Sequence, residues 1–181
     1  MRLIKLTVLF LSIQCVYSCA EIEARRPVSQ KSGTFFKESV QRNIKLTEED
    51  EALIQAIIKK DTSKTYYPTE SGFWYAYIKK DSLGTKKPQV GEEVHFIYSL
   101  SELDGTAILS TAQIGKQAYV IDKSNQDLIR GIREGLKLMK VGETVHFLLP
   151  SHLAYGYYGL EEYIGTNVPI GATITLQTIE E

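Results

Sequence analysis

The stretch QDLIRGIREGLKLMK at residues 126–140, continued by VGETVHFLLP at 141–150, is the most informative part of this sequence. Its apolar residues return every three or four positions, which is the period of a helix with one buried face. Val141 and Gly142 end this helix, because glycine is common just after a helix C-terminus. Residues 144–149 then predict a strand. The residues of the apolar stripe are Leu128, Ile129, Ile132, Leu136 and Met139.

The segments on either side of this helix have the pattern of strands. Residues 70–78 are rich in aromatic strand formers, and in 93–100 apolar residues occupy every second position. Asp104 and Gly105 predict a tight turn. Further extended runs are expected at 108–110, 119–121 and 172–179. Residues 70–181 are therefore predicted to form one β-rich domain with a single internal helix.

The first residues are typical of a secretory signal. Arg2 and Lys5 precede an apolar run from Leu6 to Ile13, which is shorter than the roughly 20 residues that a membrane span requires. Val16-Tyr17-Ser18-Cys19 resembles the lipobox of bacterial lipoproteins, although Tyr17 departs from its usual small or polar residue. The resemblance implies a signal peptide at 1–18 and acylation of Cys19. The alternative is ordinary secretion, which would leave Cys19 as an unpaired thiol.

Two segments are expected between the signal and the β-rich domain. Residues 19–45 are polar, show no structural period and predict a flexible tether. Residues 46–69 predict an amphipathic helix and a linker, with Thr47 as the helix cap. The sequence leaves three roles open for the apolar face of this helix: packing on its own domain, forming a dimer or binding a partner.

The overall composition excludes several classes of protein. Hydrophobic residues make up 43% of the 181 residues and charged residues 24%, as in a folded domain, and the net charge of −1 gives no general attraction to nucleic acids. Two cysteines exclude a disulfide scaffold. No Cys/His spacing for zinc, nucleotide-binding loop or Gly-x-Ser-x-Gly turn occurs. We therefore expect no metal, no cofactor and no nucleic-acid partner.

Four segments with matching order and spacing carry a resemblance to FKBP-type peptidyl-prolyl isomerases. The resemblance covers about residues 70–181 and includes an insertion of about four residues in the last loop. The leader, the upstream helix and the loop at 156–167 are similar to the gliding-motility-associated FKBP-type lipoproteins of Bacteroidetes. The four segments are LIRGIREGL at 128–136, MKVGE at 139–143, PSHLAYG at 150–156 and VPIGAT at 168–173.

The resemblance implies an α+β fold, a twisted antiparallel sheet of five or six strands wrapped over one helix, with an N-terminal helical extension. It implies isomerisation of peptide bonds before proline in a pocket between sheet and helix. Tyr155, Ile129 and Tyr98 would be the catalytic residues, with contacts to client carbonyls from the Ile129 N–H and the Tyr155 hydroxyl. The substrate-binding residues would be Ile108, Leu109, Tyr119, Leu128, Ile132, Val168 and Leu176.

The sequence departs from the family pattern at three pocket positions. Ile108 and Leu109 stand where the family commonly has an aromatic residue followed by Asp, and Ile132 replaces the usual Trp. We expect an apolar box without a carboxylate, weak or narrow isomerase activity and poor binding of macrolide inhibitors. The alternative function is a proline-recognising chaperone or assembly subunit with little or no turnover.

The leader and the resemblance together predict a location and partners. We expect a lipid-anchored protein of the cell envelope, facing the periplasm from the outer membrane. Its partners would be proline-containing polypeptides, among them components of gliding motility, and it would assist the folding of exported proteins. The sequence does not specify an oligomeric state.

Overall fold

The computed structural model describes residues 32–81, 84, 86–123 and 127–180, and the chain divides into units of 1–37 and 38–181. The helix α2 (Ser32–Lys60) contributes Ser32–Lys37 to the first unit and its remaining residues to the second. The predicted signal peptide, the Cys19 lipidation site and the first part of the tether lie outside the described residues.

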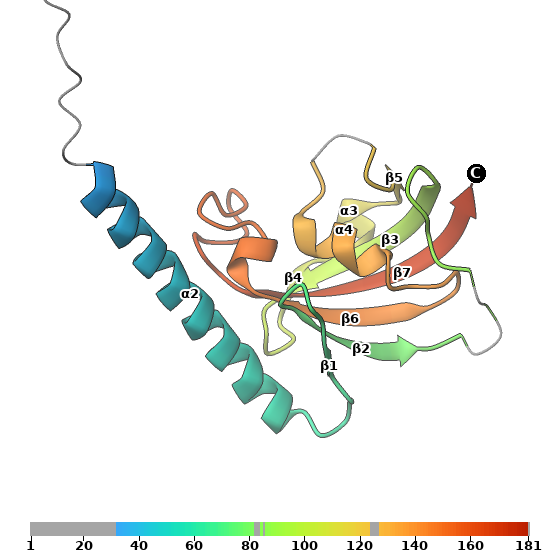
Figure 1. The fold of residues 1–181 in the computed structure, drawn as a ribbon. Helices are drawn as coiled ribbons and strands as arrows, with labels where there is room; N and C mark the ends of the chain where they lie inside the picture. The colour runs from blue at the N-terminus through green and yellow to red at the C-terminus, as the bar shows by residue number, and fades with distance from the viewer. Residues whose placement is uncertain (1–31, 82–83, 85, 124–126, 181) are drawn as a thin grey trace, which may run out of the picture. The chain divides into compact units, whose positions relative to one another are not determined.

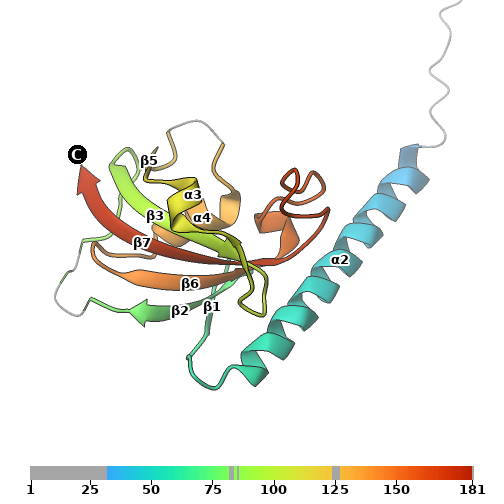
Figure 2. The ribbon, with the colours of Figure 1, turned by 180° about the vertical axis from the view of Figure 1, so that it is seen from behind.

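The second unit contains a seven-stranded antiparallel sheet. Its strand order is β1-β2-β6-β7-β3-β4, and β5 pairs separately with β3 (Figures 1 and 2). The strands are β1 (Tyr67–Pro68), β2 (Trp74–Lys79), β3 (Glu93–Ser101), β4 (Ala107–Leu109), β5 (Gln117–Val120), β6 (Thr144–Leu149) and β7 (Ile170–Glu180). The short helices are α3 (Thr111–Ile114), α4 (Arg130–Leu136) and the 3₁₀ turn η2 (Ser151–Leu153).

One face of the sheet forms the core with α4. Val94, Phe96 and Leu100 of β3 are buried, as the period-two pattern of that strand predicts. They belong to one apolar cluster with Ile132 and Leu136 of α4. The helix therefore closes one side of the sheet, and the side chains between them make the main core.

Two glycines let α4 lie close to the sheet. A Cβ atom on Gly131 would be 2.6 Å from Leu149 Cδ1, and one on Gly135 would be 2.9 Å from Phe147 Cζ. Real side chains do not approach so closely. The motif at 128–136 thus has glycine at two positions where a side chain would collide with the residues of the sheet.

The predicted fold class is confirmed, with three differences in detail. The sheet has seven strands rather than five or six, because the two-residue β1 adds to one edge. The predicted helix at 126–140 is shorter and covers Arg130–Leu136. The helix α3 was not predicted from the sequence. It starts with a capping box: the Ser110 hydroxyl accepts from the Gln113 N–H, and the Gln113 side chain accepts from the Ser110 N–H.

The prediction of a tether over 19–45 is wrong for residues 32–45, which are helical. From Thr34 to Lys60 the sequence contains neither glycine nor proline, so the helix continues through the polar stretch. Thr47 does not cap the helix as predicted but lies inside it, and its hydroxyl donates to the Asn43 carbonyl at 3.0 Å. Hydrophobic periodicity alone could not place the start of the helix, because residues 36–45 are largely exposed.

The second half of α2 packs on its own domain, one of the three alternatives that the sequence left open. Asp50 and Ile54, one turn apart, are both buried, whereas Leu53 is exposed. Over the described residues, no helix combines the length and the hydropathy that a membrane span would need.

Candidate active site

A cavity of about 290 Å³ opens beside the core at the edge of the sheet. Its walls come from β3, β5 and the segment before α4, so three separate parts of the chain build it. Three of the residues predicted for the substrate pocket meet there: Tyr98, Tyr119 and Leu128. The remaining lining residues are Phe96, Gln117, Ala118 and Asp127.

Tyr98 and Tyr155 are two half-buried phenols, and both have a raised pKa. Burial raises the pKa of Tyr98. Burial, together with the nearby Tyr98, raises the pKa of Tyr155 to about 12. Tyr98 also stacks on Phe96, with ring centroids 5.9 Å apart. A phenol is already neutral at physiological pH at its usual pKa near 10, so both hydroxyls can donate hydrogen bonds there.

Tyr119 brings a polar atom into the apolar wall. Its side chain is 4% exposed, and its hydroxyl is buried without a hydrogen-bond partner among the described residues. An unsatisfied buried hydroxyl costs roughly 1–3 kcal/mol. Such a group at a cavity wall is a potential donor to a bound ligand.

The other predicted site residues lie in or around the same apolar cluster. Ile132 and Leu176 are fully buried in it, and Ile108, Leu109 and Ile129 pack against it while partly exposed. Ile129 immediately precedes α4. Val168 is different: it is 37% exposed in the loop before β7 and does not belong to the cluster.

Two polar residues of the cavity were missed from the sequence. Gln117 and Asp127 line it, so the expectation of a box without a carboxylate is wrong for this cavity. The acid does not stand at the position of Leu109, where the family commonly has one. Asp127 directly precedes the motif at 128–136, but its own residue type gave no signal that it faces a cavity.

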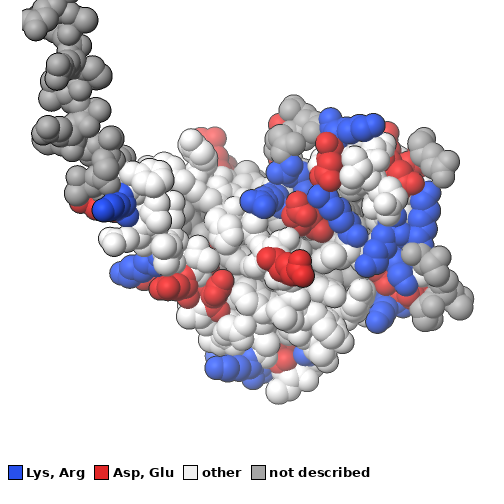
Figure 3. All heavy atoms as spheres, viewed as in Figure 1, with Lys and Arg blue, Asp and Glu red and all other residues white. Residues whose placement is uncertain are grey.

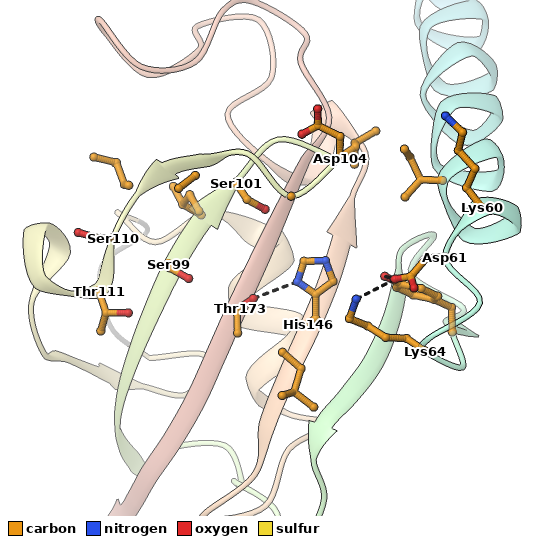
Figure 4. Close-up of a pocket in the computed structure, with 18 residues that line it drawn as sticks. Lys60, Asp61, Lys64, Ser99, Ser101, Asp104, Ser110, Thr111, His146 and Thr173 are labelled. Atoms are coloured by element: carbon orange, nitrogen blue, oxygen red, sulfur yellow. Dashed lines mark hydrogen bonds and ion pairs between the residues drawn. The ribbon is translucent and has the colours of Figure 1, made fainter.

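A larger cavity, of about 900 Å³, lies on the opposite face of the sheet (Figure 4). The end of α2 and the segment after it form one wall, the β3–β4 hairpin forms another, and outward-facing residues of β6, β7 and β3 form the floor. Leu109 lines this cavity rather than the smaller one. The floor residues include His146, Thr173, Ser99 and Ser101.

His146 is held on the floor of the larger cavity as a neutral group. Its Nδ1 lies 3.0 Å from the Thr173 hydroxyl, and its ring meets Tyr66 edge to face. Burial, reinforced by Lys64 and opposed by Asp61, lowers the pKa of His146 to about 4. Lys64 itself is paired with Asp61 at 2.7 Å. This arrangement gives His146 a structural role.

Among the described residues that line the smaller cavity, Asp127 is the one charged residue. On the face seen in Figure 3, basic and acidic side chains are interspersed among uncharged ones. Recognition in the smaller cavity therefore depends on its apolar and aromatic walls and on a few polar groups.

Of the four sequence segments that were singled out, the first contributes Leu128 to the smaller cavity, and all four contribute residues to the apolar cluster. A sequence profile of FKBP-type peptidyl-prolyl cis-trans isomerases matches residues 84–177, more than half of the chain. The chain belongs to this family. Among FKBP-type relatives, FkpA from Aeromonas hydrophila is 35% identical over 131 residues, which are 72% of this chain and 46% of that protein. Human FKBP9 is 37% identical over 71 residues, 39% of this chain and 12% of that protein.

Two solved structures share the fold. The crystal structure of FkpA from Escherichia coli has a TM-score of 0.58 at 21% identity and covers 96% of this chain and 81% of its own. A peptidyl-prolyl cis-trans isomerase from Pseudomonas syringae has a TM-score of 0.57 at 21% identity, over 75% of this chain and 96% of its own. The chain spans less than half the length of the Aeromonas protein and about an eighth of human FKBP9.

Proposed function

We propose that this FKBP-type chain catalyses cis–trans isomerisation of peptide bonds before proline, using the 290 Å³ cavity. The observation that carries the proposal is the meeting of Tyr98, Tyr119 and Leu128 in one cavity, at the family positions. A proline ring is compact and apolar, and the cavity offers aromatic and aliphatic walls of matching character.

The reaction is a rotation and requires no nucleophile. The planar X-Pro amide has partial double-bond character, which gives a barrier of about 20 kcal/mol and isomerisation times of tens to hundreds of seconds. Twisting the bond removes the resonance and the charge separation that it creates. A water-poor apolar cavity favours the less polar twisted amide over the planar one. About 1.4 kcal/mol of such preference gives a tenfold acceleration.

Two donors are assigned to the carbonyl groups that flank the proline. The Tyr155 hydroxyl remains protonated because its pKa is raised to about 12. The Ile129 N–H stands just before the first turn of α4, where helix geometry leaves amides without partners inside the helix. Hydrogen bonds from both would hold the client backbone in the twisted geometry.

A chaperone without turnover is the second candidate, favoured by Leu109 and Ile132. Both residues are aliphatic, so neither supplies the aromatic ring or the carboxylate that the family commonly has at its position. In addition, Leu109 lines the larger cavity, and Ile132 is fully buried and does not line the smaller one. Refolding of a protein whose slow phase is limited by proline isomerisation separates the two functions. An isomerase accelerates the slow phase at substoichiometric concentration, whereas a chaperone suppresses aggregation near equimolar ratio and leaves the slow phase unchanged.

We further propose that the protein acts in the cell envelope on exported proteins, among them gliding-motility components, anchored by acylation at Cys19. The basic and apolar leader supports this location, and the Val16–Cys19 sequence supports the anchor. Fractionation tests the anchor: Cys19→Ser should move the protein from membranes to the soluble fraction. Retention of the variant in membranes would exclude the lipid anchor.

A further inference from the structure

Asp50 is a buried acid on the helix that precedes the isomerase domain. It is 4% exposed, and its Oδ2 accepts hydrogen bonds from the Ser151 N–H at 2.8 Å and from the Ser151 hydroxyl at 2.6 Å. Within the described residues, both of the side-chain hydrogen bonds to Asp50 come from this one serine. A buried carboxylate is unfavourable unless hydrogen bonds replace its water, and an apolar side chain would hold the helix without that cost. The choice of an acid here therefore indicates that the contact serves to orient Ser151 and not only to attach the helix.

Ser151 holds the turn that carries Tyr155. It begins η2 directly after Pro150, whose ring fixes the backbone angle φ. The Ser151 carbonyl accepts from the Ala154 N–H at 3.0 Å and from the Gly156 N–H at 2.9 Å. These two amides stand immediately before and after Tyr155. One serine, fixed by Asp50, thus restrains both flanks of the catalytic tyrosine.

The position of Tyr155 depends on this turn. Within the described residues its hydroxyl makes no hydrogen bond that would hold it from the other end. The backbone therefore sets where the side chain lies, and its phenol is within electrostatic range of Tyr98, which lines the cavity. A displacement of about 1 Å at a catalytic group can lower a rate by about a hundredfold.

We propose that Asp50 is a positioning residue of the active site, which holds Ser151 and thereby fixes the turn that presents the Tyr155 hydroxyl to the client. The middle of α2 lies beside the loop of residues 151–171 in both ribbon views (Figures 1 and 2). The N-terminal helix is then part of the catalytic apparatus. The inference rests on the isomerase function proposed above.

Steady-state kinetics on the full chain with a short prolyl peptide tests the proposal. Asp50→Ala should lower kcat about tenfold and leave KM within about twofold, because the apolar walls of the cavity are unchanged. Ser151→Ala keeps the N–H and should lower kcat about threefold. Asp50→Asn supplies an amide oxygen to the same donors and should stay within about twofold of wild type.

Two controls separate positioning from general attachment of the helix. Glu51→Ala changes an exposed neighbouring acid and should alter nothing. Ile54→Ala weakens the buried face of α2 without touching the Asp50–Ser151 bonds and should lower stability but not the kcat of the folded protein. An equal loss of kcat in Ile54→Ala and Asp50→Ala would overturn the proposal.

A second measurement does not need turnover. In protein labelled with ¹³C in the tyrosine rings, the Tyr155 signal is identified by its loss in Tyr155→Phe. Asp50→Ala and Ser151→Ala should shift this signal, and Glu51→Ala should not. If the wild-type protein shows no isomerase activity, the proposed function is refuted. The shift of the Tyr155 signal would still show whether Asp50 positions the Tyr155 side chain. If Asp50→Ala does not fold, Asp50→Leu decides, because it fills similar space and removes both bonds to Ser151: an unchanged signal and an unchanged kcat would refute the role of Asp50.

Discussion

The phenol of Tyr155 lies within electrostatic range of the phenol of Tyr98, and burial raises the pKa of both. One comes from the middle of β3 and the other from the turn after η2, so the fold joins segments more than fifty residues apart. The pair explains how an apolar cavity retains a hydrogen-bond donor at its edge.

The raised pKa of Tyr155 predicts a loss of stability at alkaline pH. The folded protein holds this proton until about pH 12, whereas the unfolded chain releases it near pH 10. The stabilisation is therefore fully present below pH 10 and declines as the pH rises toward 12. Urea unfolding at pH 9 to 11 should show a smaller decline for Tyr155→Phe than for wild type. Tyr158→Phe, at a 93% exposed residue, should not change the slope.

The lowered pKa of His146 predicts a loss of stability at acid pH. Its pKa falls from 6.5 to about 4 on folding, so the unfolded chain binds a proton that the folded protein excludes. The stabilisation is present above pH 6.5 and is lost as the pH falls toward 4; after solvent screening it should be on the order of 1–2 kcal/mol. His146→Asn should reduce the acid dependence of the free energy of unfolding. His95→Asn is the control, because it leaves the His146–Thr173 contact in place.

Gly131 should not tolerate a side chain. An added methyl group would lie 2.6 and 2.7 Å from the Leu149 methyl carbons and 3.0 Å from the Leu153 carbonyl oxygen. Alanine gains about 1 kcal/mol of helix propensity, but overpacking a core costs about 1–3 kcal/mol. Gly131→Ala should therefore lower the free energy of unfolding by up to about 2 kcal/mol. Arg130→Ala, at the exposed start of the same helix, should stay within about 0.5 kcal/mol; a Gly131→Ala variant that is more stable than wild type would contradict this packing.

Tyr119→Phe should raise the stability of the protein and leave its isomerase activity nearly unchanged. The substitution removes a buried hydroxyl that lacks a partner among the described residues, so the free energy of unfolding should rise by about 1 kcal/mol. Isomerase activity should stay within about twofold, because the aromatic wall is preserved. A loss of stability in denaturant unfolding would show that the hydroxyl has a partner in solution.

The sequence predicted those parts of the fold that depend on a regular period. The alternation along residues 93–100 and the stripe at 128–139 correspond to β3 and to the region of α4, because burial on one face requires these periods. The helix over residues 32–45 could not be predicted in this way, because residues 36–45 are largely exposed and the polar residues of the segment show no period.

The candidate site was predictable only where a family motif defined it. Tyr98, Tyr119 and Leu128 meet in one cavity, but Leu109 lines the other one. The pairing of β3 with β4 shifts register between Leu100 and Ser101, and such a bulge changes the face that a side chain occupies. Sequence alone does not place a bulge. Nor does it pair Asp50 with Ser151, because their contact joins residues 101 positions apart.

The central claim is tested most directly by the cis–trans exchange rate of a short prolyl peptide, measured by NMR exchange spectroscopy with and without the protein. Wild type should raise the rate at least about tenfold above the uncatalysed value, which corresponds to about 1.4 kcal/mol. Tyr155→Ala should lose most of this acceleration, and Tyr158→Phe should keep it. Equal exchange rates with wild type, with Tyr155→Ala and without protein would show that this cavity does not catalyse prolyl isomerisation.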